Sequence, residues 1–291
     1  MQTIIRQWTI GSVDMGCDVM ETYFIVSDIH SYYKELMDAL KEKQFNIDNP
    51  HHHLICCGDL FDRGPGTREL FKFVIGLGDR FHYVRGNHED LLFDALINIE
   101  TQRDISNHHV SNGTIQTIAD FCEMLPWFII DPARPTSIND EVYIKTAPLR
   151  DFIQNKSMNY LTLGDFVFVH GWIPCVDEGE SLRYNKPVSV IPMAEWDSDR
   201  SSYWWRKARW LNGMRAWQDG FRISGKTIVC GHWHCSWGWS HIKNERKEFP
   251  GKSREDWLKS FEPFTEDGII AIDACTAYSG IVNCIKMEVE E

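Results

Sequence analysis

The feature that most constrains the fold is a recurring pattern, in which a short apolar run ends in a polar motif of varying sequence. The pattern occurs five times, and its polar ends are Asp28-Ile29-His30, Gly58 to Gly64, Gly86 to Glu89, His170-Gly171 and Gly231 to His234. Polar residues that follow separate strands of an α/β sheet converge on one crevice, and glycine permits the sharp turns between them. The pattern therefore predicts one site built from five strand ends.

The apolar runs predict an α/β or mixed α+β fold. Strands are expected at 23–27, 53–57, 81–84, 166–169, 227–230, 268–272 and 281–287. The last two are expected to pair antiparallel, and Ser31 and Thr67 are expected to cap helices. No repeat or linker divides the chain, so we expect a single domain over 1–291, with insertions near 172–222 and 243–264.

Composition narrows the possible partners. The formal charge of -12 opposes binding to a nucleic-acid polymer or a membrane surface. No segment approaches the roughly 20 apolar residues that a membrane span needs. Nine cysteines, an odd number without paired CxxC spacing, do not describe a disulfide framework. A cytoplasmic protein is expected.

The side chains of the five polar ends are of the types that bind transition metals. Carboxylate, imidazole and amide groups together suit Mn, Fe or Zn. A carboxylate such as Asp59 can bridge two cations, and a metal pair roughly 3.5 to 4 Å apart activates water and neutralises a phosphoryl group. The motifs therefore predict hydrolysis of a phosphate bond.

The GDxxDRG string at 58–64 and the GNHE string at 86–89, in order with the DxH, HG and GHxH elements, carry a family resemblance. They resemble the phosphoprotein phosphatase family of calcineurin-like metallophosphoesterases. The layout is similar to the bacterial and phage branch, which includes lambda phosphatase and symmetrical dinucleoside tetraphosphatases. The match covers most of residues 21–287 and implies a sandwich of two β-sheets flanked by helices.

The resemblance also implies roles for individual residues. Two divalent metals are expected, with manganese first and iron or zinc as alternatives. Their implied ligands are Asp28 and His30 for the first metal, Asp59 as the bridge, and Asn87, His170 and His232 for the second. His234, from the GHxH form, either completes the first metal's shell or is a hydrogen-bond donor outside it.

His88 is the implied general acid, with Asp62 as its partner. Arg63 and Arg85 are implied to bind substrate phosphate through their forked guanidinium groups. Arg206, after a Trp-x-Arg string, is the expected third phosphate-binding arginine, and three alternatives lie nearby, namely Arg200, Arg209 and Arg215.

Ten of the twelve tryptophans lie after residue 170. They could form a wall that stacks a nucleobase, but packing of the insertion onto the sheet is expected for most of them. The leading hypothesis is hydrolysis of phosphomonoesters, such as those of phosphoserine or phosphothreonine in a phosphoprotein. Symmetrical hydrolysis of dinucleoside polyphosphates is second, and a non-catalytic metal-containing binding protein is third.

Overall fold

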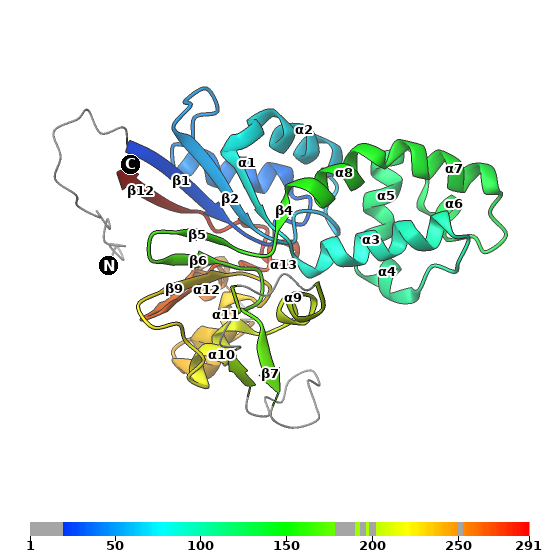
Figure 1. Cartoon of the computed structure of the whole chain (residues 1–291). Helices are drawn as coiled ribbons and strands as arrows, with labels where there is room; N and C mark the ends of the chain where they lie inside the picture. Colours follow the sequence, from blue (N-terminus) through cyan, green and yellow to red (C-terminus); the bar gives the residue numbers. More distant parts are fainter. Residues whose placement is uncertain (1–19, 178–189, 193–195, 198–201, 250–252, 291) are drawn as a thin grey trace.

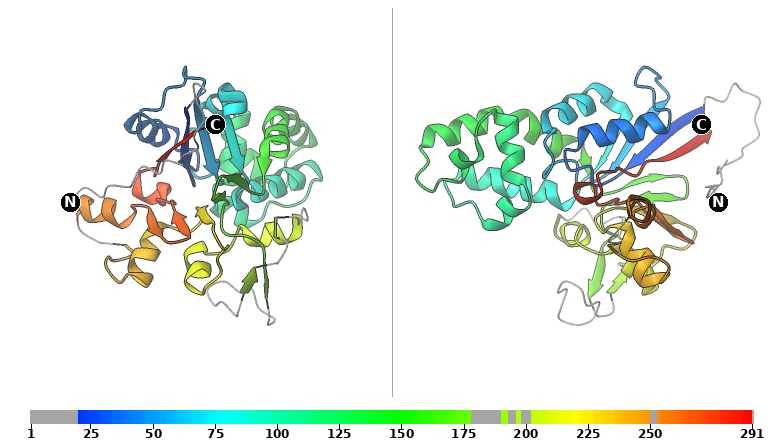
Figure 2. Two further views of the ribbon diagram at one scale, coloured as in Figure 1. Left: turned by 60° about the vertical axis from the view of Figure 1, so that its left-hand side comes forward. Right: turned by 180° about the vertical axis from the view of Figure 1, so that it is seen from behind.

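The computed structural model describes residues 20–177, 190–192, 196–197, 202–249 and 253–290. Two five-stranded sheets pack face to face and carry helices on their outer sides (Figures 1 and 2). This confirms the expected mixed α/β class and the sandwich of two sheets.

The first sheet has the strand order β12-β1-β2-β3-β4. Its strands are β1 (Met20–Val26), β2 (His52–Cys57), β3 (Phe81–Val84), β4 (Ser157–Met158) and β12 (Ile285–Glu290). The strands β1 to β4 run parallel, and β12 is antiparallel to β1. Three parallel strands therefore end together at the edge where the first three polar motifs begin.

The second sheet has the strand order β10-β11-β9-β6-β5. Its strands are β5 (Leu161–Leu163), β6 (Phe166–Phe168), β9 (Thr227–Cys230), β10 (Phe264–Glu266) and β11 (Ile269–Ala271). The three central strands, β6, β9 and β11, are parallel, and the two outer strands are antiparallel to their neighbours. A separate hairpin consists of β7 (Cys175–Asp177) and β8 (Val190–Pro192).

Alternation along the strands builds the core. Tyr23 and Ile25 of β1 point between the sheets, where they meet Phe168 and Val229 of the second sheet. Phe24, the residue between them, faces the helices outside the first sheet. Because successive side chains on a strand point to opposite faces, a strand with apolar residues on both faces is buried on both sides. The packing of the inner faces sets how the two sheets lie on each other, and so where their strand ends lie.

The expected pairing of the last two strands is wrong. The strand at 269–271 joins the second sheet, where β11 lies parallel to β9, while β12 joins the first sheet beside β1. The segment between them contains α13 (Thr276–Ser279) and crosses from one sheet to the other. Short separation favours a hairpin only when both strands belong to one sheet.

The two expected helix caps are also wrong. Helix α1 (Tyr33–Glu42) begins after Tyr32, and α2 (Thr67–Leu77) begins after Gly66, in both cases without a side-chain cap. The Ser31 and Thr67 hydroxyls, both buried, instead bond to each other at 3.0 Å. A buried hydroxyl needs a partner, and each of these finds the other rather than its own helix.

The helices α3 to α8 follow β3 and precede β4 in the chain. They form a lobe at the right of Figure 1. They are α3 (Asn87–Glu100), α4 (Asn107–Ser111), α5 (Thr114–Cys122), α6 (Pro126–Ile130), α7 (Thr136–Lys145) and α8 (Ala147–Lys156). Sequence reasoning did not single out this lobe. Since α3 opens with Asn87 and His88, the lobe is attached directly to the strand-end motifs.

Of the remaining described helices, α9 (Ser202–Ala208), α10 (Gly213–Gln218) and α12 (Arg254–Ser260) lie in the two segments that were expected to be insertions. The helices η1 (Gly78–Arg80), α11 (Cys235–Trp237) and η2 (Gly238–Ile242) lie outside them. Parts of both segments lie outside the described residues, as does Arg200, so the insertions stay a prediction. In the described ranges no helix has the length and apolar character to cross a bilayer, and the eight cysteines found there are unpaired.

Candidate metal centre

The strand-end motifs meet between the two sheets. Asp28 and His30 follow β1, Asp59 follows β2, Asn87 opens α3 after β3, His170 follows β6 and His232 follows β9. All are buried except His232, which is half-buried. Asp28, His30, Asp59 and His232 have φ between 50° and 66°. Such angles are uncommon outside glycine, and clusters of them are typical of functional turns.

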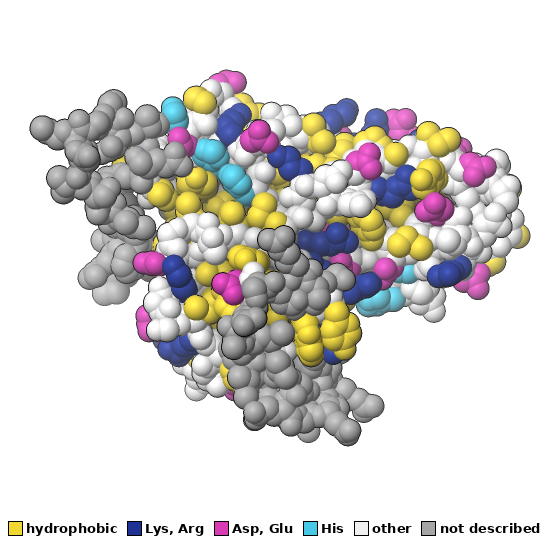
Figure 3. All heavy atoms as spheres, in the orientation of Figure 1, with side chains coloured by type: hydrophobic (Ala, Val, Ile, Leu, Met, Phe, Trp, Pro, Cys, Tyr) yellow, Lys and Arg dark blue, Asp and Glu magenta, His cyan; other side chains and the backbone are white. Residues whose placement is uncertain are grey.

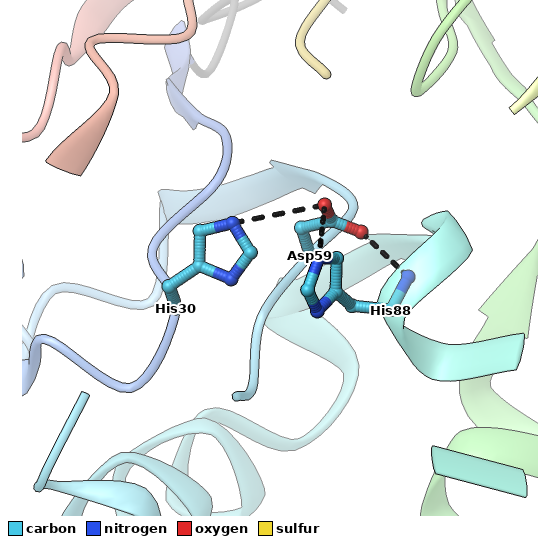
Figure 4. Close-up of side chains that lie close together, drawn as sticks. All are labelled: His30, Asp59 and His88. Atoms are coloured by element: carbon cyan, nitrogen blue, oxygen red, sulfur yellow. Dashed lines mark hydrogen bonds and ion pairs between the residues drawn. The ribbon is translucent and has the colours of Figure 1, made fainter. Parts of the chain in front are cut away.

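Asp59 lies at the centre of this arrangement (Figure 4). Its Oδ2 atom is 3.7 Å from His30 Nε2 and 3.9 Å from His88 Nε2. Its Oδ1 atom is 3.2 Å from His170 Nε2. Two sets of ligand atoms that lie within 4.8 Å of one another share this carboxylate, namely His30, Asp59 and His88, and Asp59, His170 and His232. The structure thus has two adjacent half-sites joined through Asp59.

Three imidazoles are turned toward the centre in the same way. His30 Nδ1 donates to the Phe61 carbonyl at 3.0 Å, and His170 Nδ1 donates to the Cys57 carbonyl at 2.8 Å. The His232 ring donates to the Trp210 carbonyl. In His30 and His170 the hydrogen bond fixes the tautomer and leaves Nε2 facing Asp59, which is the arrangement found in metal-binding histidines. Burial, with His170 nearby, lowers the pKa of His232 to about 3, which keeps this ring neutral.

The other two predicted ligands complete the arrangement. Asn87 Oδ1 lies 2.8 Å from His170 Nε2. Asp28 Oδ2 accepts hydrogen bonds from the Ser27 hydroxyl at 2.5 Å and the His232 backbone N–H at 2.9 Å. Burial, followed by the charge of Asp273, raises the pKa of Asp28 well above its usual value. Buried carboxylates that repel one another need compensating positive charge.

These observations fit divalent cations. Carboxylate and imidazole ligand atoms lie within 4.8 Å of one another in each half-site, and together with the Asn87 amide their chemistry suits Mn, Fe or Zn. A cation in each half-site would offset the repulsion among the buried carboxylates.

His88 has a different set of contacts. Its Nδ1 atom lies 2.9 Å from Asp62 Oδ2, and its Nε2 atom lies 3.0 Å from the Arg63 guanidinium. Thr114 donates to the same Asp62 oxygen at 2.8 Å, which holds the carboxylate in place. Burial alone would lower the pKa of His88, but Asp59 and the hydrogen-bonded Asp62 together raise it above its usual value. This favours the protonated form that a general acid requires.

Glu89 binds backbone N–H groups of the segments that carry Asp59 and Asn87. Its carboxylate accepts backbone hydrogen bonds from Asp59 at 3.1 Å, Leu60 at 3.0 Å and Gly86 at 2.7 Å. The Gly86 contact is part of a capping box at the start of α3. Glu89 therefore has a structural role at the N-terminus of α3, where negative charge is favourable, and this role extends to the loop that carries Asp59.

The change Glu89→Gln should lower the free energy of unfolding by about 1 to 3 kcal/mol, because an amide has one acceptor oxygen for three buried N–H donors. Urea titration of the metal-free protein measures this free energy of unfolding. Glu69→Gln is the matched control, since Glu69 is exposed in the first turn of α2 and its replacement should change stability by less than about 0.5 kcal/mol. Equal stability of the two variants would contradict the supporting role.

The predicted phosphate-binding arginines are placed differently from one another. Arg63 is exposed and contacts His88. Arg85 Nε donates to Asp90 at 2.8 Å, and Arg206 pairs with Asp94. Both of these aspartates lie on α3. Arg209 is 5% exposed and donates to Asp90 at 2.7 Å and to Asn159 at 2.6 Å. Of the candidate arginines that the structure describes, only Arg63 contacts a residue of the two ligand sets with its own side chain.

The structure does not bring His234 into either half-site. Its Nδ1 atom lies 2.8 Å from the Ser236 hydroxyl, and its Nε2 atom lies 3.4 Å from Glu248. This geometry agrees with the alternative in which His234 is a hydrogen-bonding residue outside the metal's shell.

Sequence reasoning missed Asp273, which follows β11 and is 5% exposed. Its Oδ1 atom accepts the Cys275 N–H at 2.6 Å. Burial, together with the charge of Asp59, raises its pKa to about 6. The signal was available, because Asp273 occupies a strand end like the predicted ligands, but the surrounding Ile-Asp-Ala-Cys string has no glycine or histidine to mark it.

Comparison with known proteins agrees with the geometry. Residues 22–236 match the model of the family described as calcineurin-like phosphoesterase. The asymmetrical bis(5'-nucleosyl)-tetraphosphatase PrpE of Bacillus subtilis is 30% identical over 55% of this chain and 62% of its own length. The symmetrical bis(5'-nucleosyl)-tetraphosphatase of Buchnera aphidicola is 33% identical over 38% of this chain and 40% of its own. The chain thus matches less than two thirds of either relative.

Among solved structures, the cold-active protein-tyrosine phosphatase of a psychrophilic Shewanella species aligns over 91% of this chain and 75% of its own. The sequence identity is 13% and the TM-score is 0.43. At this level of likeness the alignment adds nothing on substrate or mechanism.

Proposed function

Since the chain belongs to the calcineurin-like phosphoesterase family, we propose that it hydrolyses phosphoanhydride or phosphoester bonds with two divalent metal ions. The observation that carries this proposal is the Asp59 carboxylate, which is shared by two buried sets of ligand atoms. The full set of contacts of His88 with Asp62 and Arg63 argues against a non-catalytic binding protein, because such a protein needs no oriented acid.

In this proposal Asp28, His30 and Asp59 hold the first metal, and Asp59 with Asn87, His170 and His232 holds the second. When bound, such a metal pair lowers the pKa of water and neutralises charge on the phosphoryl group. The protein's own contribution is to orient the imidazoles through their carbonyl contacts. His234 is assigned a hydrogen-bonding role next to this centre rather than a ligand role.

His88 is the proposed general acid. Its Nδ1 is held by Asp62, so the proton available for transfer would be carried by Nε2. Arg63 lies 3.0 Å from Nε2 and can only donate, so its guanidinium would turn from Nε2 to the substrate phosphate when Nε2 is protonated. Transfer of that proton to the leaving oxygen would prevent the build-up of charge there. Asp62 would stabilise the cationic ring before transfer and orient it throughout.

Arg63 is proposed to bind the substrate's phosphate oxygens beside His88. Arg85 and Arg206 remain candidates, but each would first have to exchange its present carboxylate partner for phosphate. Such exchange is easier for Arg206, whose side chain is 52% exposed, than for Arg85, which is 21% exposed. Arg209, tied to Asp90 and Asn159, is better placed to hold α9 against α3.

The substrate class favoured by the comparisons is the dinucleoside polyphosphates, the second hypothesis from the sequence. The two relatives described above carry this activity in their names, one asymmetrical and one symmetrical. No comparable observation favours a phosphoprotein. A cytoplasmic location would suit a small soluble substrate of this kind and the unpaired cysteines of the described residues.

The test is to strip the protein with chelator, reload it with Mn²⁺, Fe²⁺ or Zn²⁺, and measure turnover of diadenosine tetraphosphate, a phosphoserine peptide and an aryl phosphate. We expect no turnover without metal and the highest kcat/KM for the dinucleotide. Products of ADP alone would indicate symmetrical cleavage, and ATP with AMP would indicate asymmetrical cleavage. A phosphopeptide preference would reverse the substrate assignment, and metal-independent turnover would contradict the mechanism.

A further inference from the structure

The first turn of helix α5 lies against two residues that the proposed mechanism uses beside the metals. Asp62 and Arg63 belong to the motif that follows β2, whereas α5 belongs to the helical lobe. Thr114 and Thr117 of this turn are fully buried, and both contact Asp62. The lobe therefore reaches the site through residues that the strand-end motifs do not include.

The two threonines hold different parts of Asp62. The Thr114 hydroxyl donates to the Asp62 carboxylate at 2.8 Å, and the Asp62 backbone N–H donates to the Thr117 hydroxyl at 2.9 Å. Asp62 and Arg63 have φ angles of 74° and 64°, which residues other than glycine seldom adopt. Such a backbone persists only where its surroundings hold it. The first turn of α5 supplies part of that support.

Gly113 allows α5 to approach this closely. It precedes the helix with a φ of 81°, and a Cβ atom at this position would lie 2.7 Å from the Arg63 Cα atom and closer still to its backbone nitrogen. Non-bonded carbon atoms are about 3.5 to 4 Å apart at their best separation. A side chain at this position would thus push α5 and Arg63 apart, so the fit places Arg63 as well as Asp62.

Helix α5 is itself fixed by the core. Ile115 and Ile118 are buried in the apolar cluster that also contains Phe61 and Leu92. Phe61 directly precedes Asp62, and Leu92 lies on α3, the helix that carries the proposed general acid. Groups on a packed helix are positioned more precisely than groups on a loop. The threonine hydroxyls are therefore presented to Asp62 by a rigid element.

The orientation of the Asp62 carboxylate depends on Thr114. Its Oδ2 atom accepts from Thr114 and from His88 Nδ1, while its buried Oδ1 atom has no hydrogen-bond partner in the part of the chain that the structure describes. The torsion that turns a carboxylate has broad minima, so the bond from His88 alone would let the two side chains turn together. The Thr114 hydroxyl fixes the Oδ2 atom, and through it the direction of the imidazole.

We propose that Thr114 is a positioning residue for the hydrolysis: through Asp62 it aims the proton of His88 at the leaving oxygen. This inference rests on the proposed function and makes the helical lobe part of the catalytic machinery. Figure 3 shows Lys and Arg side chains gathered where the lobe meets the rest of the molecule. An anionic substrate bound there would lie against the lobe as well as the strand ends.

Kinetics of Thr114→Val in the Mn²⁺-loaded full chain test the positioning, because valine keeps the side-chain volume and lacks the hydroxyl. The kcat for diadenosine tetraphosphate should fall by about 5- to 100-fold, with KM and metal content unchanged. The kcat for an aryl phosphate should fall much less, since its leaving group needs no proton. Thr114→Ser, which keeps the hydroxyl, should restore most of the rate. Thr114→Val should slow an Asp62→Asn variant no further, because residues that act as a unit are not additive.

Thr146→Val is the matched control. Thr146 is also fully buried in the helical lobe, and its hydroxyl donates to the Val142 carbonyl at 2.7 Å. Its replacement removes a buried hydrogen bond of the same kind away from the site, and should leave both kcat values unchanged. Equal slowing of the two substrates by Thr114→Val would show a general structural effect and would overturn the positioning role. An unchanged kcat for the dinucleotide would also overturn it.

A measurement without turnover separates this inference from the proposed function. If the native protein hydrolyses neither substrate, the proposed function fails, and NMR of the Zn²⁺-loaded full chain with isotope-labelled histidine decides the positioning. The His88 Nδ1 proton, assigned by its absence in His88→Asn, should give a low-field resonance in the native protein. That resonance should be lost or shifted in Thr114→Val and kept in Thr114→Ser. An unchanged resonance in Thr114→Val, or none in the native protein, would contradict the role of Thr114.

Discussion

Replacing Asp59 by Asn should remove at least one of the two metals and lower kcat/KM by about 10³-fold, at the upper end of the range for the loss of one charge-stabilising group. The carboxylate is the one side chain common to both sets of ligand atoms. An amide of the same shape keeps an oxygen for the His88 backbone N–H, which now donates to Asp59 Oδ1 at 3.0 Å. The fold should therefore survive while the negative charge that holds the metals is lost.

Elemental analysis and kinetics on the same preparation measure this prediction. Asp48→Asn is the control, because Asp48 is exposed before β2 and its replacement removes the same charge far from the strand ends. It should keep both metals and full activity. If Asp59→Asn retained two metals per chain with native kcat/KM, Asp59 would not be a bridging ligand.

Replacing His88 by Asn should slow turnover of substrates with poor leaving groups by about 10²- to 10⁴-fold, the contribution of a general acid. An aryl phosphate such as p-nitrophenyl phosphate should be affected much less, because its leaving group departs without a proton. Metal content should not change. The metal content decides whether His88 is a general acid or a metal ligand, because His88 Nε2 lies 3.9 Å from Asp59 and belongs to the first set of ligand atoms.

A variant of Asp62 tests the assignment of His88 as the general acid. If it acts only through His88, Asp62→Asn should slow the same substrates, and the double variant should be no slower than His88→Asn alone, since residues that act as a unit are not additive. His241→Asn serves as the control, because His241 is 47% exposed and contacts Glu248. Loss of metal in His88→Asn and His88→Ala would instead make His88 a ligand.

The strands could be predicted where local pattern decides them. The bounds expected for 81–84 and 227–230 are those of β3 and β9, because a short apolar run bounded by polar or glycine residues has few other ways to bury itself. The six proposed ligands could be picked out for a related reason. Each follows such a run, and the ends of parallel strands meet at one edge.

Local pattern does not decide which strands become neighbours. β11 and β12 are close in sequence but belong to different sheets, and only the packing of the two sheets on each other separates them. In the same way, Ser31 and Thr67 were predicted to cap their own helices, but the approach of α1 and α2 pairs the two hydroxyls. Asp273 joins the site through the same long-range packing, without a motif of its own.

The sequence by itself therefore determined the class of fold and the candidate metal ligands with their positions in the chain, since these depend on apolar runs and on the residues that end them. The tertiary structure alone decided the direction in which each polar side chain points. It turns His234 toward Glu248, pairs Arg85 and Arg209 with Asp90, and brings the Trp210 ring near the His108 ring. These contacts join residues far apart in the chain, or side chains whose rotamers are chosen by neighbours, and no local pattern contains that information.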